Sequence, residues 1–268
     1  MSEKTKSYIE ELDAGVKNLF ASDNYKKYLD FLSRFHSYSV NNTIAIFLQR
    51  PDASLVASYT DWKKHKRFPR RGESGIRIIA PHVYEVEKTN GKTEQVVGFH
   101  LAYTFDISQT EGEPLPETPC KPIDTEITGA QSLLDMLSQK CSPVPVEFIE
   151  FEGSANGYFN AAENKICVKP SLTDAMKVRC LLHEIAHAWL DSKFSPDNAP
   201  DQRTREVRAE SVSYCVSRYL GLDTSDYSFG YVAGWSKSQT LEELKASISC
   251  ITKTADKIIR DIESCQPA

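Results

Sequence analysis

The chain has 268 residues, of which 40% are hydrophobic and 26% are charged. These proportions are typical of a globular protein and exclude disorder of the whole chain. No apolar run approaches the roughly 18 residues of a membrane-spanning helix, and the first residues lack a signal-peptide core, so we expect a cytoplasmic protein without a membrane partner. The seven cysteines include no C-x-x-C pair, which favours reduced thiols.

The net charge of −5 is distributed unequally along the chain. Residues 1–110 carry 16 Lys and Arg against 13 Asp and Glu, whereas residues 111–268 carry 16 against 24. The segment 111–125 contains four prolines, and proline removes backbone donors and fixes φ. The sequence therefore predicts an α+β protein of two domains, 1–110 and 126–268, joined by a Pro-rich linker over 111–125.

The first predicted domain combines helices with a hairpin. Apolar positions three and four residues apart predict helices over 25–36 and 40–50. Strand-like runs at 76–80 and 83–86 precede residues 89–92, whose Asn-Gly pair suits the positive φ angles of a tight turn. The chain is expected to return along a strand over 95–105.

The second predicted domain is mainly helical with a small sheet. A short helix over 131–140 and strands over 146–151 and 165–169 precede three longer helices. These helices are expected from residue 171 or 173 to 191, from 202 to 220, and from 240 to 263.

The strongest chemical signal is an H-E-x-x-H motif formed by His183, Glu184 and His187. Residues four apart on a helix project from one face, so both histidines can bind one tetrahedral Zn²⁺, and Glu184 can act as general base toward a bound water. The alternative is a surface helix whose histidines have this spacing by chance. The motif predicts a zinc-dependent metallopeptidase.

A catalytic zinc needs a third protein ligand, and the next predicted helix offers two candidates. Glu206 and Glu210 lie four residues apart, so one can bind the metal while the other orients a histidine. We favour Glu210 as the ligand because apolar residues follow it, whereas arginines surround Glu206, which could be a solvated ion-pair residue. Asp191, one turn beyond His187, is a further acidic residue that better suits an orienting role.

The segment from Trp62 to Arg71 combines a cluster of cations with two aromatic residues, Trp62 and Phe68. Clustered cations attract phosphates and exposed rings stack on unpaired bases, so the segment could bind single-stranded DNA. A basic run can equally be a solvated loop, with both rings anchored in the core. The candidate DNA-binding residues are Trp62, Lys63, Lys64, Lys66, Arg67, Arg70 and Arg71.

Three segments together resemble the ImmA/IrrE-type zinc metallopeptidases over roughly residues 130–235. They are Gly157-Tyr-Phe-Asn160, Leu181-Leu-His-Glu-Ile-Ala-His-Ala-Trp-Leu-Asp191 and Glu206-Val-Arg-Ala-Glu-Ser-Val-Ser-Tyr214. The resemblance implies that His183 and His187 are metal ligands, that Glu184 is the catalytic acid/base, and that Glu210 is the acidic ligand.

The front half is similar to the N-terminal single-stranded-DNA-binding domain of ArdC-type antirestriction proteins. The similarity lies in Phe31-Leu-Ser-Arg-Phe-His-Ser-Tyr-Ser-Val-Asn-Asn-Thr43, Gln49-Arg-Pro-Asp-Ala53, Trp62-Lys-Lys64 and Arg71-Gly-Glu-Ser-Gly-Ile-Arg-Ile-Ile-Ala-Pro81. The two halves occur in the ArdC/LtrC-like order. This implies a protein of a plasmid or other mobile element that protects incoming DNA from restriction.

Metal-assisted peptide hydrolysis raises two further expectations. The strand over 165–169 would hold an extended substrate if it lies at the edge of the cleft. Tyr158, Tyr227 or Tyr231 could donate to the oxyanion, although each could equally be a packing residue.

Two other functions stay open. One is a regulatory zinc endopeptidase that cleaves a repressor or host protein, which the front half only docks. The other is a binding module with a structural zinc, and Glu184 argues against it because a structural site needs no general base.

Overall fold

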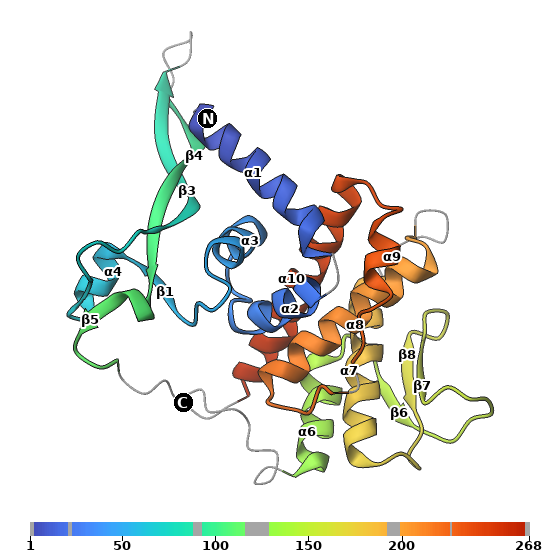
Figure 1. Cartoon of the computed structure of the whole chain (residues 1–268). Coiled ribbons are helices and arrows are strands. Elements are labelled where there is room, and N and C mark those ends of the chain that lie inside the picture. Colours follow the sequence, from blue (N-terminus) through green and yellow to red (C-terminus); the bar gives the residue numbers. More distant parts are fainter. Residues whose placement is uncertain are drawn as a thin grey trace. The chain divides into compact units, whose positions relative to one another are not determined.

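A computed structural model describes residues 3–20, 23–87, 93–115, 129–191, 199–225 and 227–265 (Figure 1). The chain divides into two compact units. The first comprises Met1–Phe31 and Tyr38–Pro116, and the second comprises Leu32–Ser37 and Glu117–Ala268. Most of the predicted linker lies outside the described residues, and a short strand runs into its first two residues, 111 and 112.

The first unit begins with helices, two of which agree with the sequence prediction to within two residues. The helix over residues 3–19 was not predicted, although its buried residues Tyr8, Leu12, Val16 and Leu19 follow a helical spacing. The helices of this part of the chain are α1 (Glu3–Leu19), α2 (Asp23–Arg34), α3 (Val40–Gln49) and the short α4 (Tyr59–Lys64).

Two small antiparallel sheets complete the first unit. The two runs expected at 76–80 and 83–86 form one continuous strand, β3, and the strand expected over 95–105 is present as β4. The predicted turn at 89–92 lies outside the described residues. One sheet has the order β1-β4-β3, and the other pairs β2 with β5. The strands are β1 (Val56–Ser58), β2 (Arg67–Pro69), β3 (Ile76–Glu87), β4 (Thr93–Asp106) and β5 (Thr110–Gly112), with a 3₁₀ turn, η1 (Ile107–Gln109), before β5.

Side-chain amides of helix α3 form hydrogen bonds with backbone groups on the outer edge of β3. The Asn42 amide accepts from the Ile79 backbone N–H at 2.8 Å and donates to its carbonyl at 2.9 Å. Gln49 makes the same pair of bonds with Arg77, at 3.0 and 2.9 Å. The two side chains therefore take the place of a further strand and protect backbone groups that would otherwise lack partners.

The second unit contains a three-stranded sheet of order β6-β8-β7. Its strands are β6 (Val146–Phe148), β7 (Gly157–Asn160) and β8 (Lys165–Val168). β8 is paired on both sides, parallel to β6 and antiparallel to β7. The condition under which the strand over 165–169 would hold a substrate, a place at the edge, is therefore not met, and the edge strand that contacts the following helix is β7.

Helices pack around this small sheet, and α7 lies along α8 (Figure 1). The helices are α6 (Ala130–Met136), which continues into a π-helical turn, η2 (Leu137–Cys141), then α7 (Asp174–Asp191), α8 (Gln202–Tyr219), α9 (Val232–Ser236) and α10 (Leu241–Glu263). The predicted helices are all present, and the short α9 was not predicted. Buried residues such as Leu182, Ile185, Val212 and Val216 hold α7 and α8 within one core.

None of the described helices has the length and hydropathy needed to cross a membrane. The six cysteines within the described residues are free thiols.

The amide bridge between α3 and β3 leads to a local test. Asn42→Ala leaves the Ile79 N–H without its acceptor, and such a loss costs about 1–3 kcal/mol. We expect the Ile79 amide to exchange its hydrogen roughly fivefold faster or more in the full-length variant, measured by NMR or mass spectrometry. Asn41→Ala, at the exposed neighbouring position, is the control, and equal exchange in the two variants would contradict the proposed role of the bridge.

Candidate functional site

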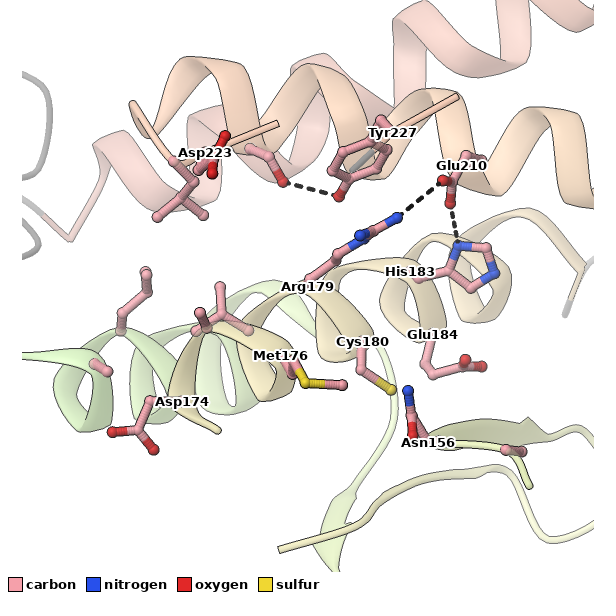
Figure 2. Close-up of a pocket in the computed structure, with 18 residues that line it drawn as sticks. Asn156, Asp174, Met176, Arg179, Cys180, His183, Glu184, Glu210, Asp223 and Tyr227 are labelled. Carbon is pink, nitrogen blue, oxygen red and sulfur yellow. Dashed lines mark hydrogen bonds and ion pairs between the residues drawn. The ribbon is translucent and has the colours of Figure 1, made fainter. Parts of the chain in front are cut away.

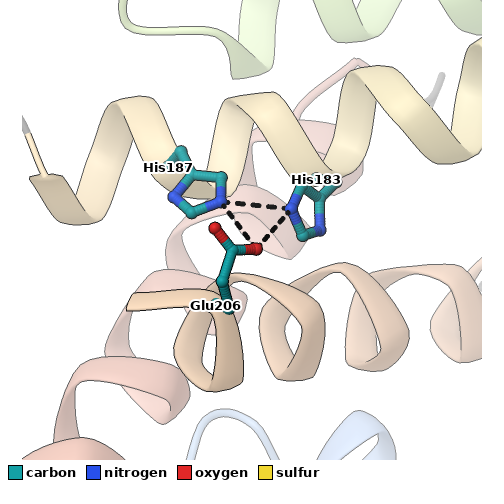
Figure 3. A group of neighbouring side chains, drawn as sticks. All are labelled: His183, His187 and Glu206. Atoms are coloured by element: carbon teal, nitrogen blue, oxygen red, sulfur yellow. Dashed lines mark hydrogen bonds and ion pairs between the residues drawn. The ribbon is translucent and has the colours of Figure 1, made fainter. Parts of the chain in front are cut away.

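Three side chains from α7 and α8 converge on one point (Figure 3). The Nε2 atoms of His183 and His187 lie 3.1 Å apart. Oε2 of Glu206 lies 3.4 Å from Nε2 of His183 and 3.6 Å from Nε2 of His187. One ligand atom from each residue lies within 4.8 Å of the others, so the group could hold a metal ion.

The surroundings of these side chains fit a divalent cation. Nδ1 of His183 lies 3.1 Å from Oε2 of Glu210, and Nδ1 of His187 lies 2.8 Å from Oδ2 of Asp191. A carboxylate on one ring nitrogen fixes the orientation of the ring and leaves the other nitrogen for the metal. Two imidazoles and one carboxylate form a common ligand set of catalytic zinc sites, with a position left for water.

The positions of the two glutamates of α8 are the reverse of those that the sequence favoured for the metal ligand and the orienting residue. Glu206, and not Glu210, lies beside both Nε2 atoms, while Glu210 contacts the far nitrogen of His183. The prediction rested on burial, and Glu210 is indeed the less exposed side chain, at 20% against 47% for Glu206. Burial is required of an orienting residue as much as of a ligand, so it does not separate the two roles.

The carboxylates control the protonation of the histidines. Burial lowers the pKa of His183, but hydrogen bonds to Glu206 and Glu210 outweigh this effect and raise it to about 10. Burial also lowers the pKa of His187, and Asp191 and Glu206 raise it to about 8. The same hydrogen bonds hold the pKa of Glu206 far below its usual range. Without a cation, protons on the two histidines offset part of the negative charge of the three carboxylates that contact them.

Glu184 lies on the side of α7 that faces β7. The carboxylate is buried, with 8% of the residue exposed, and it accepts a hydrogen bond from the backbone of Phe159. Burial raises the pKa of Glu184 above its ordinary value. A raised pKa suits a group that must accept a proton from water near neutral pH.

The three candidate tyrosines have different surroundings. The Tyr227 hydroxyl lies 2.9 Å from Ser213 Oγ and 3.2 Å from Ser217 Oγ and is buried, so it has the position of a packing residue. The Tyr158 ring packs on the edge of another aromatic ring. Tyr231 is 39% exposed, and burial together with the charges of the two α8 glutamates raises its pKa to about 12.

A cavity of about 780 Å³ opens beside the metal cluster (Figure 2). His183, Glu184 and Glu210 line one end of it. Figure 2 shows that the cavity follows α7, with β7 on one side and α8 on the other. Of the three residues of the metal cluster, His183 lines this cavity.

The basic segment of the first unit is partly structural. Trp62 is 1% exposed and its indole N–H donates to the Phe105 carbonyl at 2.8 Å, so its ring anchors the core and does not face an incoming base. Arg67 is half-buried and donates to the Thr110 hydroxyl, the Thr110 carbonyl and the Glu113 carbonyl, so it holds β2 to β5. The sequence left these core roles open as the alternative.

The other five cations of the segment are exposed. Lys64, Lys66 and Arg70 form ion pairs with Asp61, Glu113 and Glu73. Within the part of the chain that the structure describes, Lys63 and Arg71 form no ion pair.

Two exposed aromatic residues lie beside these cations. Tyr59, at the start of α4, is 53% exposed, and Phe68, in β2, is 41% exposed. Their ring centroids are 6.5 Å apart. Tyr59 was not among the candidates from the sequence, because no helix was predicted over residues 59–64 and nothing in the local pattern distinguishes an exposed tyrosine there from a buried one.

Comparison with known proteins finds a family model that matches the front of the chain. Residues 1–107 match the model of the N-terminal domain of anti-restriction factor ArdC. The chain is also 27% identical, over 98% of its length, to an uncharacterized protein of Bacillus anthracis, pXO2-81. The chain spans about half, 52%, of that relative's length.

Two solved structures have the same fold as most of the chain. Both are of the antirestriction ArdC protein from the R388 plasmid, at 19% identity. The metal-free structure gives a TM-score of 0.53 over 86% of this chain and 87% of the other, and the Mn(II)-bound structure gives 0.56 over 85% and 86%. The chain therefore has an ArdC-like fold, and its front part matches the ArdC N-terminal domain.

The geometry predicts that the two glutamates contribute unequally to metal affinity. Glu206→Gln removes the carboxylate at the Nε2 atoms, whereas Glu210→Gln only weakens the orientation of His183, which costs about 10–100-fold. We expect Glu206→Gln to weaken Zn²⁺ binding at least tenfold more than Glu210→Gln in a competition titration with a chelator. A larger loss of Zn²⁺ affinity in Glu210→Gln would indicate that Glu210 is the third ligand, as the sequence favoured.

Metal affinity should also depend on pH. Because the pKa of His187 is about 8 and that of His183 about 10, both rings carry a proton below pH 8 that a cation must displace. We expect Mn²⁺ affinity to rise from pH 6 to 8, by up to about a hundredfold per pH unit if both protons leave. Affinity that is constant over this range, after correction for the competing chelator, would contradict these protonation states.

Proposed function

We propose that this chain is an antirestriction protein of a mobile element, in which the first unit binds single-stranded DNA and the second is a zinc-dependent peptidase. The observation that carries the proposal is the presence of both parts in one chain. Residues 1–107 match the ArdC N-terminal domain, and the second unit brings His183, His187 and Glu206 together beside a buried Glu184. The ArdC-like fold over 86% of the chain agrees with this arrangement.

In the proposed site His183, His187 and Glu206 hold the metal, and Glu210 and Asp191 orient the two rings. When bound, a divalent cation polarises a carbonyl and lowers the pKa of a coordinated water. Glu184 accepts the proton of the attacking water and returns it to the leaving amine.

Two more features of the second unit would assist this reaction. The Phe159 backbone bond to Glu184 holds the carboxylate at the edge of the sheet, where β7 offers backbone groups to an extended peptide. Tyr231, exposed beside the two glutamates, is the tyrosine best placed to donate to an oxyanion.

On the first unit we propose that Tyr59 and Phe68 stack on unpaired bases, while the exposed cations contact phosphates. Lys63 and Arg71 are the main phosphate contacts, since neither has an acidic partner among the described residues. Lys64, Lys66 and Arg70 would exchange their carboxylate partners for phosphates.

Replacement of the two rings tests the DNA surface. Base–aromatic stacking is worth about 1–3 kcal/mol per base, so Tyr59→Ala and Phe68→Ala should each weaken binding of a fluorescent single-stranded oligonucleotide roughly fivefold or more. The control is Tyr103→Ala, an exposed ring of β4 outside this surface. Lys63→Gln should lower the slope of log K against log salt by about 0.7. Equal affinity for the duplex would contradict the single-strand proposal.

A regulatory endopeptidase is the second candidate, and the large cavity beside the metal cluster favours it. In that case the metal-binding unit, and not DNA binding, is the essential part of the protein.

Glu184→Gln separates the two candidates. The variant keeps the metal ligands and the DNA surface but lacks the proton acceptor, so we expect unchanged metal and oligonucleotide binding with peptide hydrolysis reduced by about a hundredfold or more. Protection of transferred DNA from restriction is then measured in cells. Protection lost with hydrolysis favours a proteolytic role, and full protection would show that hydrolysis is dispensable for it.

A further inference from the structure

Several exposed apolar side chains of the first unit lie on the two-stranded ribbon formed by β3 and β4 (Figure 1). Val83 and Val97, which lie directly opposite one another across the ribbon, are 61% and 57% exposed. A two-stranded ribbon is marginally stable in water, and contiguous exposed apolar surface marks an interaction site. The large apolar residues of the ribbon that are at least 40% exposed are Val83, Tyr84, Val86, Val97, Phe99 and Tyr103.

Hydrogen bonds on both sides of the ribbon show which backbone groups of β4 point outward. Successive residues of an antiparallel strand direct their N–H and C=O groups to opposite edges. The Ile79 backbone groups of β3 bond to α3, so they point away from β4. The residue opposite, Leu101, therefore points its backbone groups away from β3. The same edge of the chain continues at Ile107, whose N–H donates to the Leu55 carbonyl next to β1.

This outer edge of β4 lacks a strand partner over most of its length. Within the described residues, β1 pairs with it only from Thr104 to Asp106. Natural proteins protect such an edge with lysine, proline or a bulge, but residues 93–103 contain no lysine or proline and pair with β3 without a bulge. The edge is therefore open to another strand. The residues of β4 that face it before β1 begins are Thr93, Gln95, Val97, Phe99, Leu101 and Tyr103.

The charge of the ribbon favours protein over nucleic acid as the partner. Among the described residues of β3 and β4, Arg77 is the single lysine or arginine, and it forms an ion pair with Glu11 at 2.9 Å. Binding of phosphates relies on clustered cations, which this surface lacks. The acidic residues of the two strands are Glu85, Glu87, Glu94 and Asp106.

We propose that a second copy of this chain binds the outer edge of β4, so that the two ribbons form one antiparallel sheet of order β3-β4-β4-β3. The two-fold axis passes Val97, which sets Val97 opposite its counterpart and Gln95 opposite Phe99 of the second copy. All of these residues direct their backbone groups to the edge, as an antiparallel ladder requires. The pairing supplies about ten backbone hydrogen bonds, a number typical of a specific protein interface.

Two observations favour this axis over its neighbours. An axis at Phe99 would bring Thr93 of one copy against Phe105 of the other, where β1 already pairs. An axis at Val97 pairs residues 93–101 and ends before β1. It also sets Glu94 opposite His100 of the second copy, so that an acid meets a base and not a like charge.

The mass of the full-length protein in solution is the first measurement. Sedimentation equilibrium should show a reversible shift from 30.2 kDa toward twice that mass as the concentration rises. A chain that stays a monomer up to about 1 mM would overturn the proposal, because even a weak specific pairing is populated at that concentration.

Charges placed at the axis identify the contact. Val97→Lys and Val97→Glu each set two like charges opposite one another, so each should raise the dissociation constant about fivefold or more. A mixture of the two variants should form the mixed dimer in preference to either symmetric dimer. Native mass spectrometry measures this preference when one of the variants is isotope-labelled. Because Val97 is exposed, neither substitution disturbs the core.

Val83 offers the matched control. It is as exposed as Val97 and lies opposite it in the same copy, but the two Val83 side chains of the dimer are separated by both β4 strands. A mixture of Val83→Lys and Val83→Glu should therefore show no preference for the mixed dimer. An equal preference at both positions, or none at Val97, would overturn the proposed axis.

Amide hydrogen exchange of the full-length protein checks the register. The N–H groups of Val97 and Phe99 should exchange more slowly as the concentration rises, while those of Val96 and Gly98, which face β3, should not change. Slower exchange at Tyr103 would contradict the register, because this residue lies beyond the paired segment. Protection of Val97 that requires an added single-stranded oligonucleotide would assign the edge to DNA and overturn the proposal.

Discussion

The contact between α7 and α8 at the histidine cluster is the constraint on which the second unit depends. Two imidazoles and three carboxylates meet there, and most of these groups are shielded from water. Removing charges from water is costly unless they are paired, so the groups must neutralise one another. Protons on His183 and His187 offset two of the three negative charges in the absence of a metal, and a divalent cation offsets the same number when it replaces them. The same packing thus serves both folding and metal binding.

The small sheet is placed close to α7 because one residue of β7 has no side chain. A Cβ on Gly157 would lie 2.5 Å from Sγ of Cys180 and 2.9 Å from the Cys167 carbonyl, so another residue type would push the strand and the helix apart. Their close approach brings the Phe159 backbone to the Glu184 carboxylate. The position of the Glu184 carboxylate is therefore set by a strand that lies about 25 residues earlier in the sequence.

Much of the fold could be predicted from local patterns. The spacing of apolar residues indicated the long helices, and the H-E-x-x-H spacing alone placed His183 and His187 on one face of α7. Glu206 and Glu210 could not be separated in this way, because both satisfy the same four-residue spacing. Their roles depend on how α8 crosses α7, which is a tertiary property.

Exposure was equally hard to predict in the first unit. Trp62 and Phe68 stand in the same basic segment, yet the tertiary fold buries one and exposes the other. Arg67 reads as a phosphate contact in the sequence, but its donors are used between β2 and β5. Short strands of three residues carry too little periodicity to reveal such pairing in advance.

The two halves of the sequence differ in net charge, and this difference bears on which ligand each half attracts. The excess of acidic residues after residue 110 repels a polyanion, whereas the exposed cations near Tyr59 and Phe68 attract it, so electrostatics favours the first unit as the proposed DNA-binding part. The proposed peptide substrate would instead bind in the second unit, where a cavity lined by His183 and Glu184 lies beside the metal cluster. The proposed DNA and peptide ligands therefore bind different units and need not compete for one surface. A substitution that changes specificity in one unit can leave binding by the other unit unchanged.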